Sequence, residues 1–235
     1  MTSRESLTTH LLELRSRFIR IIICFGVLAL IGIPFSSDIY NFAALPLLEI
    51  LPSGSTMIAT QVTSPLMAPL KLVFFSALLI TMHYIFYEMW MFMSPGLYKQ
   101  EKTFIAPLMV STIFLFLSGV AFAYFIVCPI IFKFFIGVAP ESILVMTDIN
   151  QYLNFVIKLI FAFGIAFEIP VATFLLIKSK IVKKETLVKA RPYLIIMFFV
   201  FGMLLTPPDI FSQLFLAIPM WVLFELGLLI AKDKS

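Results

Sequence analysis

Six apolar runs separated by polar connections constrain the fold of this chain more than any other feature. An α-helix needs about 20 apolar residues to cross a hydrocarbon core that is about 30 Å thick. Five of the runs approach or exceed this length, and Pro, Gly, Ser and Lys recur in the connections. The sequence therefore predicts an all-α polytopic membrane protein with six transmembrane helices. The expected spans are residues 18–35, 70–92, 104–132, 152–177, 193–205 and 210–230.

The composition argues against a water-soluble domain of this size. Of the 235 residues, 61% are hydrophobic and 13% are charged, whereas a soluble domain is about 45–50% apolar and about 25% charged. We expect one integral membrane domain over residues 1–235. The net charge of +4 does not indicate nucleic-acid binding, because no basic surface interleaved with aromatic residues is present. Cys24 and Cys128 lie in apolar runs, so no disulfide, metal site or cofactor is expected.

Lysine and arginine lie mainly on one side of the expected topology. The N-terminal segment, the second and fourth connections and the C-terminal segment together hold 14 of the 17 basic residues. Cytoplasmic loops carry such an excess, so both termini are expected in the cytoplasm. Residues 1–17 are expected to form an amphipathic helix along the cytoplasmic interface, because Leu7, Leu11, Leu14 and Phe18 recur at helical spacing.

Glu13 and Arg17 lie four residues apart on this segment, and two interpretations stay open. They can form an intrahelical ion pair worth about 0.2–0.5 kcal/mol, or Glu13 can be an exposed carboxylate that receives a cationic ligand. Glu101 has the same two interpretations. It lies between Lys99 and Lys102 in a connection on the same side of the membrane, where it can balance their charge or bind a ligand.

Glu168 lies past the middle of the fourth expected helix. A carboxyl group at that depth is costly unless it is protonated or solvated, so it should face a wet groove or a partner. Pro170 leaves carbonyl groups free nearby. Glu88, Glu225 and Lys158 are closer to helix ends or can snorkel, and we interpret them as anchors.

The fifth expected helix is short. Its 13 residues span about 20 Å at the α-helical rise, and Pro207 and Pro208 end it. Such a helix thins the bilayer locally or lies recessed among its neighbours. Prolines also interrupt other expected helices. We therefore expect kinked helices and a concave, cup-like body, with a short sixth helix as a further variant.

The sequence contains no arrangement of residues that indicates an enzyme. The two histidines, His10 and His83, lie near helix ends and have no serine and aspartate partners in context. No phosphate-binding glycine loop and no Cys/His metal spacing is present. No catalytic or metal-binding residue is assigned.

Four motifs are spread over nearly the whole chain. They are HLLELRSR at residues 10–17, SPGLYKQE at 94–101, AFGIAFEIP at 162–170 and GMLLTPPDIFSQ at 202–213. Together they resemble the TatC family, the core subunit of twin-arginine protein translocation, and the last motif is the most specific. One departure is the single Lys102 after Glu101, where relatives often carry more basic residues.

The resemblance implies a receptor in the bacterial inner membrane that binds twin-arginine signal peptides and helps to move folded proteins across with the proton-motive force. It implies that Glu13 and Glu101 read the two arginines, and that Arg15 and Arg17 shape the same surface. Guanidinium groups bind carboxylates bidentately and stay charged, which fits such a role.

The resemblance also implies TatA- and TatB-like single-helix subunits at the fifth and sixth helices, and self-association. It places Glu168 and Gln213 at polar positions in the membrane that couple to these partners. It further implies that function is sensitive to substitution at Pro46, Phe92, Met203 and Asp209.

A proton- or ion-coupled secondary transporter is the alternative function, because Glu168 lies at membrane depth. Transporters of this kind often show internal repeats with discontinuous helices, and no repeat is visible in the sequence. A purely structural scaffold is a third hypothesis, and it would tolerate neutralisation of Glu13, Glu101 and Glu168.

Overall fold

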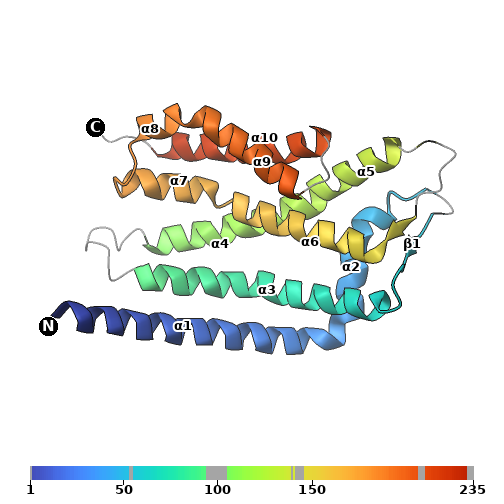
Figure 1. Cartoon of the computed structure of the whole chain (residues 1–235), viewed down its shortest axis with the longest axis horizontal. Coiled ribbons are helices and arrows are strands. Elements are labelled where there is room, and N and C mark those ends of the chain that lie inside the picture. The colour runs from blue at the N-terminus through green and yellow to red at the C-terminus, as the bar shows by residue number, and fades with distance from the viewer. Residues whose placement is uncertain are drawn as a thin grey trace. The chain divides into compact units, whose positions relative to one another are not determined.

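The computed structural model describes residues 2–52, 55–93, 105–138, 140, 146–205 and 210–231, and their side chains from Leu11 onward except at positions 93 and 105. Helices dominate this part of the chain (Figure 1). The elements in order are α1 (Thr2–Gly32), η1 (Ile33–Phe35), α2 (Ser36–Leu48), β1 (Met57–Ile58), α3 (Ser64–Met93), α4 (Ile105–Phe122), η4 (Ala123–Val127), α5 (Cys128–Val138), β2 (Thr147–Asp148), α6 (Ile149–Ala166), α7 (Ile169–Lys178), α8 (Lys184–Lys189), α9 (Arg191–Leu205) and α10 (Ile210–Ile230).

Five described helical segments are long and apolar enough to cross a membrane. They are Leu11–Leu48, Ser64–Phe92, Ala106–Val138, Ile149–Lys178 and Ile210–Ile230. The remaining expected span is α9, whose 15 residues cover about 22 Å. The short fifth helix is therefore confirmed, while the count of six spans stays a prediction. The 21 residues of α10 cover about 32 Å, so the variant with a short sixth helix is not what the structure shows.

Two expected segments differ from the structure in detail. The amphipathic segment and the first span form one unbroken helix, α1, from Thr2 to Gly32. The fourth span is interrupted, because α6 ends at Ala166 and α7 begins at Ile169. Pro170 lies in the first turn of α7, where its missing N–H leaves no helical hydrogen bond unmade.

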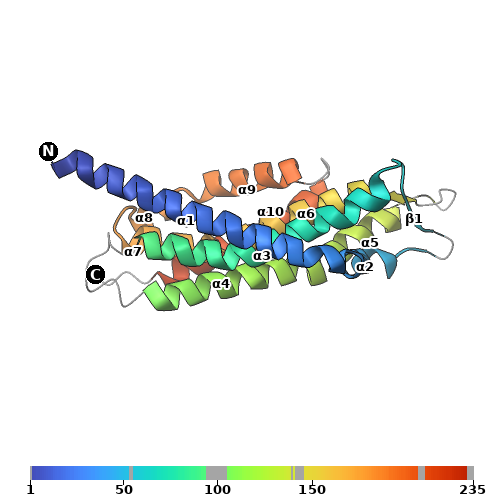
Figure 2. The ribbon, with the colours of Figure 1, turned by 90° about the horizontal axis from the view of Figure 1, so that it is seen from below.

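The chain divides into two compact units, of which the first holds residues 1–42 and 63–113. In this unit α1 packs along α3 (Figures 1 and 2). A Cβ atom at Gly32 would lie 2.9 Å from Val73 Cγ1, so the missing side chain allows the close approach. The rings of Phe25 and Phe74 add a contact with centroids 6.3 Å apart. Only 6% of the most apolar stretch of α1 is buried, as suits a helix that faces lipid.

The second unit holds residues 43–62 and 114–235, and within it α4 continues through the π-helical segment η4 into α5. Pro129 explains the wider turn, because a proline has no N–H to donate and its ring collides with the carbonyl group four residues earlier. A π-helical turn accommodates that collision without ending the helix. The bend was expected at Pro129, but its π-helical form was not.

Two glycines let α4 and α6 cross closely in the second unit. A Cβ atom at Gly119 would lie 2.5 Å from the Phe163 carbonyl oxygen, and one at Gly164 would lie 2.7 Å from the Phe116 ring. Small residues at such crossings are the usual way that membrane helices pack without a hydrophobic driving force. The crossing places Phe163 and Phe116 in the interior, where neither is exposed.

Residues of α9, α10 and the end of α6 form an apolar cluster in this unit, and α7 packs against it. Its buried members are Ala166, Phe198, Ala217, Met220, Phe224 and Leu228. A Cβ atom at Gly227 would lie 2.9 Å from both Pro170 Cα and Thr173 Cβ, so α10 and α7 also pack closely. At one end of the pair α9 and α10, Arg191 donates a hydrogen bond to Glu225 at 2.7 Å.

A short parallel pairing of β1 with β2 joins two connections of the second unit. Asp148 ends β2 and caps α6, because its carboxylate accepts a hydrogen bond from the Gln151 N–H at 3.0 Å. The same carboxylate accepts a hydrogen bond from the Thr60 hydroxyl at 2.6 Å. The Thr60 hydroxyl, followed by the Gln151 N–H, holds the pKa of Asp148 below its ordinary value. Nothing in the sequence pattern predicted these strands.

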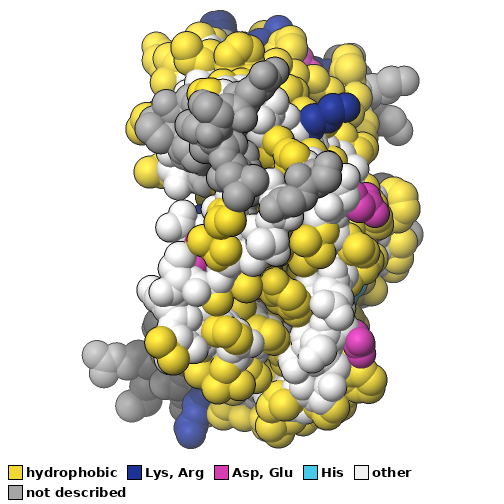
Figure 3. Space-filling view, turned by 90° about the vertical axis from the view of Figure 1, so that its right-hand side faces the viewer, with side chains coloured by type: hydrophobic (Ala, Val, Ile, Leu, Met, Phe, Trp, Pro, Cys, Tyr) yellow, Lys and Arg dark blue, Asp and Glu magenta, His cyan; other side chains and the backbone are white. Residues whose placement is uncertain are grey.

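Apolar side chains also cover much of the outside of the described helices. The face in Figure 3 is dominated by hydrophobic and uncharged side chains, with Lys, Arg, Asp and Glu at few places. Large exposed residues such as Leu30, Phe114 and Phe125 belong to this apolar exterior. Soluble monomers rarely expose so much contiguous apolar surface, so lipid is the medium that fits.

Candidate functional site

Glu13 lies on α1, one helical turn before Arg17. Arg17 donates from Nε at 3.1 Å and from Nη2 at 2.5 Å, and both bonds end on the same oxygen, Glu13 Oε1. The Glu13 side chain is 36% exposed, and Oε2 accepts no hydrogen bond from the described residues. The intrahelical pair that the spacing allowed is therefore confirmed, and within the described residues it leaves one carboxylate oxygen without a hydrogen bond.

Arg17 also reaches across to Glu88 on α3. Its Nη1 donates to Glu88 Oε2 at 2.6 Å. Arg20 donates to the same carboxylate through Nε at 3.0 Å and Nη2 at 3.1 Å, and the Tyr84 hydroxyl donates at 2.6 Å. Glu88 is only 4% exposed, so these charge-assisted bonds satisfy a buried acid and tie α1 to α3.

Phe92, near the end of α3, lies beside the Arg17 guanidinium, whose Cζ is 5.9 Å from the ring centroid, a cation–π distance. Arg15 is exposed and lies on another side of α1, because residues two apart on a helix do not face each other. It joins no ion pair within the described residues. Glu101 and Asp209 lie outside the described residues. We call the connected set the arginine cluster: Glu13, Arg17, Arg20, Tyr84, Glu88 and Phe92.

Glu168 lies in the interruption between α6 and α7, which the sequence did not predict. It is the N-cap residue of α7, and its carbonyl oxygen accepts a hydrogen bond from the Ala172 N–H at 2.9 Å. Its N–H donates to the Ile165 carbonyl at 3.0 Å. The partly buried carboxyl group is thus at the N-terminal end of a helix, where negative charge interacts favourably with the helix dipole.

The remaining candidates belong to the second unit. Gly202 on α9 approaches Gln213 on α10, where an added Cβ would lie 3.5 Å from Gln213 Cα. Gln213 is half-buried at this contact, and the neighbouring Met203 is exposed. Pro46 is buried inside α2.

The part that Glu88, Arg20 and Tyr84 play was not predicted from the sequence, where Glu88 is interpreted as an anchor. An acid in an apolar helix one turn after a tyrosine is nevertheless a signal of a polar contact. The arginines that complete the contact are 68 and 71 residues away along the chain. Periodicity within one helix carries no information about such distant partners.

The cluster is suited to binding guanidinium groups. Two carboxylates and two arginines are interleaved in it, and its most exposed acid, Glu13, already binds one guanidinium. No group of three or more His, Cys, Asp or Glu residues that could hold a metal ion occurs among the residues that the structure describes.

Comparisons with known proteins agree over almost the whole chain. Residues 9–219 match the family model described as Sec-independent protein translocase protein (TatC). The chain is 48% identical over 228 residues to the Sec-independent protein translocase protein TatC of Haemophilus influenzae, covering 97% of this chain and 89% of that protein. It is 49% identical over 228 residues to the TatC protein of Escherichia coli, covering 97% and 88%.

Two solved structures are also similar. One is a crystal structure of the twin-arginine translocase receptor TatC, with a TM-score of 0.84 and 35% sequence identity over 94% of this chain and 97% of that one. The other is that receptor in the detergent DDM, with a TM-score of 0.86 over 95% and 100% of the two chains. This chain is a multi-pass membrane protein that belongs to the TatC family of Sec-independent protein translocase proteins.

Proposed function

We propose that this chain is the receptor subunit of a twin-arginine translocase and that it binds the signal peptides of folded cargo proteins. Membership of a translocase family makes it a transport protein and not an enzyme, and one that acts with other Tat subunits. The proton-motive force drives transport, and this subunit hydrolyses no nucleotide.

Among the described residues, Glu13 Oε2 accepts no hydrogen bond, and this observation carries the proposal. Arg17 uses only Oε1 of this carboxylate, so a guanidinium from a visiting peptide can bind Oε2 without displacing Arg17. Glu88 holds Arg17 from the other side, which keeps the internal arginine from blocking the whole carboxylate. Arg17 thereby orients Glu13 for an incoming cation.

Glu101 supplies the second carboxylate in this proposal. Adjacent side chains of an extended peptide point to opposite sides, so two neighbouring arginines need acids on separate elements. Guanidinium presents a planar fork of donors and lysine does not. A lysine pair would therefore bind with lower affinity at the same site.

The orientation in this proposal rests on the charges. The excess of basic residues supports a cytoplasmic position for both termini and the arginine cluster, and membership of the TatC family supports the bacterial inner membrane as the location. TatA- and TatB-like single-helix subunits pack against α9 and α10 and near Glu168, and copies of this chain self-associate. The apolar part of the signal peptide then lies against the lipid-facing helices.

Peptide binding to single variants tests the proposal. We would measure the affinity of a twin-arginine signal peptide and of its twin-lysine counterpart by fluorescence anisotropy, for the wild type, Glu13→Gln and Glu101→Gln. Each variant should bind the arginine peptide about 10-fold more weakly, the equivalent of about 1.4 kcal/mol for one charge-assisted contact. Glu185→Gln, which neutralises an exposed acid on α8, is the matched control and should bind normally.

Unchanged affinity in both variants would remove the recognition claim. The secondary-transporter alternative makes a different prediction, because it requires proton-coupled uptake of a small solute by proteoliposomes that contain this chain alone. A scaffold would show neither peptide binding nor uptake.

A further inference from the structure

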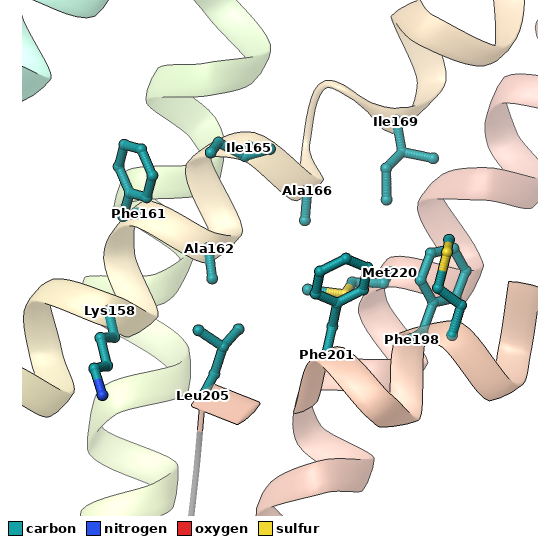
Figure 4. Close-up of a pocket in the computed structure, with 11 residues that line it drawn as sticks. Lys158, Phe161, Ala162, Ile165, Ala166, Ile169, Phe198, Phe201, Leu205 and Met220 are labelled. Atoms are coloured by element: carbon teal, nitrogen blue, oxygen red, sulfur yellow. The ribbon is translucent and has the colours of Figure 1, made fainter. Parts of the chain in front are cut away.

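An apolar cavity of about 410 Å³ lies between α6, the start of α7 and α9 in the second unit. One wall is a row along α6 and α7 that includes Ala162, Ile165 and Ile169, and Phe201 on α9 lies opposite (Figure 4). Met220 of α10 also lines the cavity and is buried. The volume is within the usual range of ligand sites, about 300–1,000 Å³.

The size of the cavity favours a slender occupant. An α-helix with its side chains is about 10–12 Å across, so about 4–5 Å of its length, one turn or less, would fill 410 Å³. A single-helix protein partner could therefore lie over the mouth but not inside. A hydrocarbon chain is thin enough to enter.

Lys158 is the only charged residue among the described residues that line the cavity. It lies at one end of the row, with Ile169 at the other (Figure 4). Its side chain is exposed, and it forms no ion pair or hydrogen bond with any residue in the described ranges. Ten residues separate it from Asp148 at the start of α6, which places it about 15 Å along the helix.

A lysine at that depth needs an anion or water at its ammonium group. Its four-carbon stem can line the apolar wall while the charged end lies at the rim. The described residues thus form an apolar slot with one positive charge at one end. That arrangement complements a molecule with a hydrocarbon chain and an anionic head.

We propose that this cavity binds an anionic phospholipid, with part of one acyl chain between α6 and α9 and the phosphate group at Lys158. Basic pockets between transmembrane helices bind anionic headgroups for the same physical reason. This lipid site is independent of the arginine cluster, which lies in the other unit, so it does not rest on the proposed binding of signal peptides.

Lipid binding by the delipidated protein tests the site. Native mass spectrometry would measure the affinities of dioleoyl-phosphatidylglycerol and dioleoyl-phosphatidylcholine for the wild type, Lys158→Gln, Lys158→Arg and the control Lys133→Gln. Lys133 is an exposed lysine on α5 that does not line the cavity. The wild type should bind phosphatidylglycerol about 10-fold more tightly, the ratio that one ion pair of about 1.4 kcal/mol gives.

Lys158→Gln should lose this preference while it keeps its affinity for phosphatidylcholine. Lys158→Arg and Lys133→Gln should keep the preference. Ala162→Trp, which fills the cavity, should weaken the binding of both lipids, and its circular dichroism spectrum checks that it folds.

Three results would overturn the proposal. A Lys158→Gln variant that still prefers phosphatidylglycerol would show that the charge is not used. An equal loss in Lys133→Gln would show an unspecific effect of surface charge. A photoreactive residue could also be placed at position 162 in membranes of known lipid content. If it formed adducts with protein and none with lipid, the occupant would be a protein instead.

Discussion

Glu88→Gln tests how strongly the arginine cluster holds α1 to α3. Glutamine keeps the size of the side chain but removes the negative charge to which Arg17, Arg20 and Tyr84 donate hydrogen bonds. Breaking a buried ion pair by removing one partner costs about 3–5 kcal/mol. Two features lower this figure here, because Arg17 keeps Glu13 and the Arg20 side chain is 50% exposed. We expect a loss of about 2 kcal/mol, which lowers the ratio of folded to unfolded protein about 30-fold.

Glu225→Gln is a matched control, since Glu225 also accepts from an arginine of a neighbouring helix. Its side chain is 24% exposed and that of Arg191 is 43% exposed. Ion pairs near the surface contribute about 0–1 kcal/mol. The control should therefore lose less than about 1 kcal/mol.

Tryptophan fluorescence during denaturant unfolding in detergent measures both variants. The chain has two tryptophans, of which Trp90 lies two residues after Glu88 and Trp221 four residues before Glu225. Single-tryptophan backgrounds, Trp221→Phe and Trp90→Phe, report each region separately. Equal destabilisation by Glu88→Gln and Glu225→Gln would refute the reasoning from burial.

Three further predictions concern the helices and their connections. Gly164→Leu should destabilise the protein by about 1–3 kcal/mol through overpacking against Phe116. Gly137→Leu should be tolerated, because nothing lies within 4 Å of an added Cβ there. Thermal unfolding in detergent compares the two variants. Folding lowers the pKa of Asp148, so the carboxylate binds a proton more tightly in the unfolded chain than in the folded one. The contribution of Asp148 to the free energy of unfolding is therefore present above about pH 4 and is lost as the pH falls through the folded pKa. Unfolding followed over this pH range should show that loss in the wild type and not in Asp148→Asn. A nitroxide label at the exposed Val200 on α9 should report a bilayer thinner than that beside α3, and equal depth profiles would contradict local thinning.

Helix identity and length could be predicted from the sequence because lipid imposes a simple rule. A spanning helix must be apolar over a set length, so the runs that became α3 and α10 were visible directly. The short α9 was visible for the same reason, since prolines end its run after thirteen residues. The spacing of Glu13 and Arg17 likewise predicted a contact that the structure contains.

Features that depend on contacts between distant segments could not be predicted. Glu88 meets Arg17 across 71 residues. Met57 of β1 pairs with Thr147 of β2, although α3, α4 and α5 lie between the two strands in the chain. No periodic pattern encodes either contact. The interruption at Glu168 was hidden because the apolar run continues through it, and only the hydrogen bonds show that α6 ends there. Packing, not composition, decides these details.

A double-mutant cycle between the protein and its peptide tests most directly whether Glu13 contacts a ligand arginine. Affinities would be measured for wild type and Glu13→Gln, each with the twin-arginine peptide and with peptides in which either arginine is replaced by glutamine. Close charge pairs at interfaces show coupling energies of about 1.5–7 kcal/mol. Because the Glu13 side chain is partly exposed, we expect a coupling energy at the lower end, about 1.5 kcal/mol, between Glu13 and one of the two arginines. Additive effects at both arginines, with no coupling to Glu13, would contradict a direct contact.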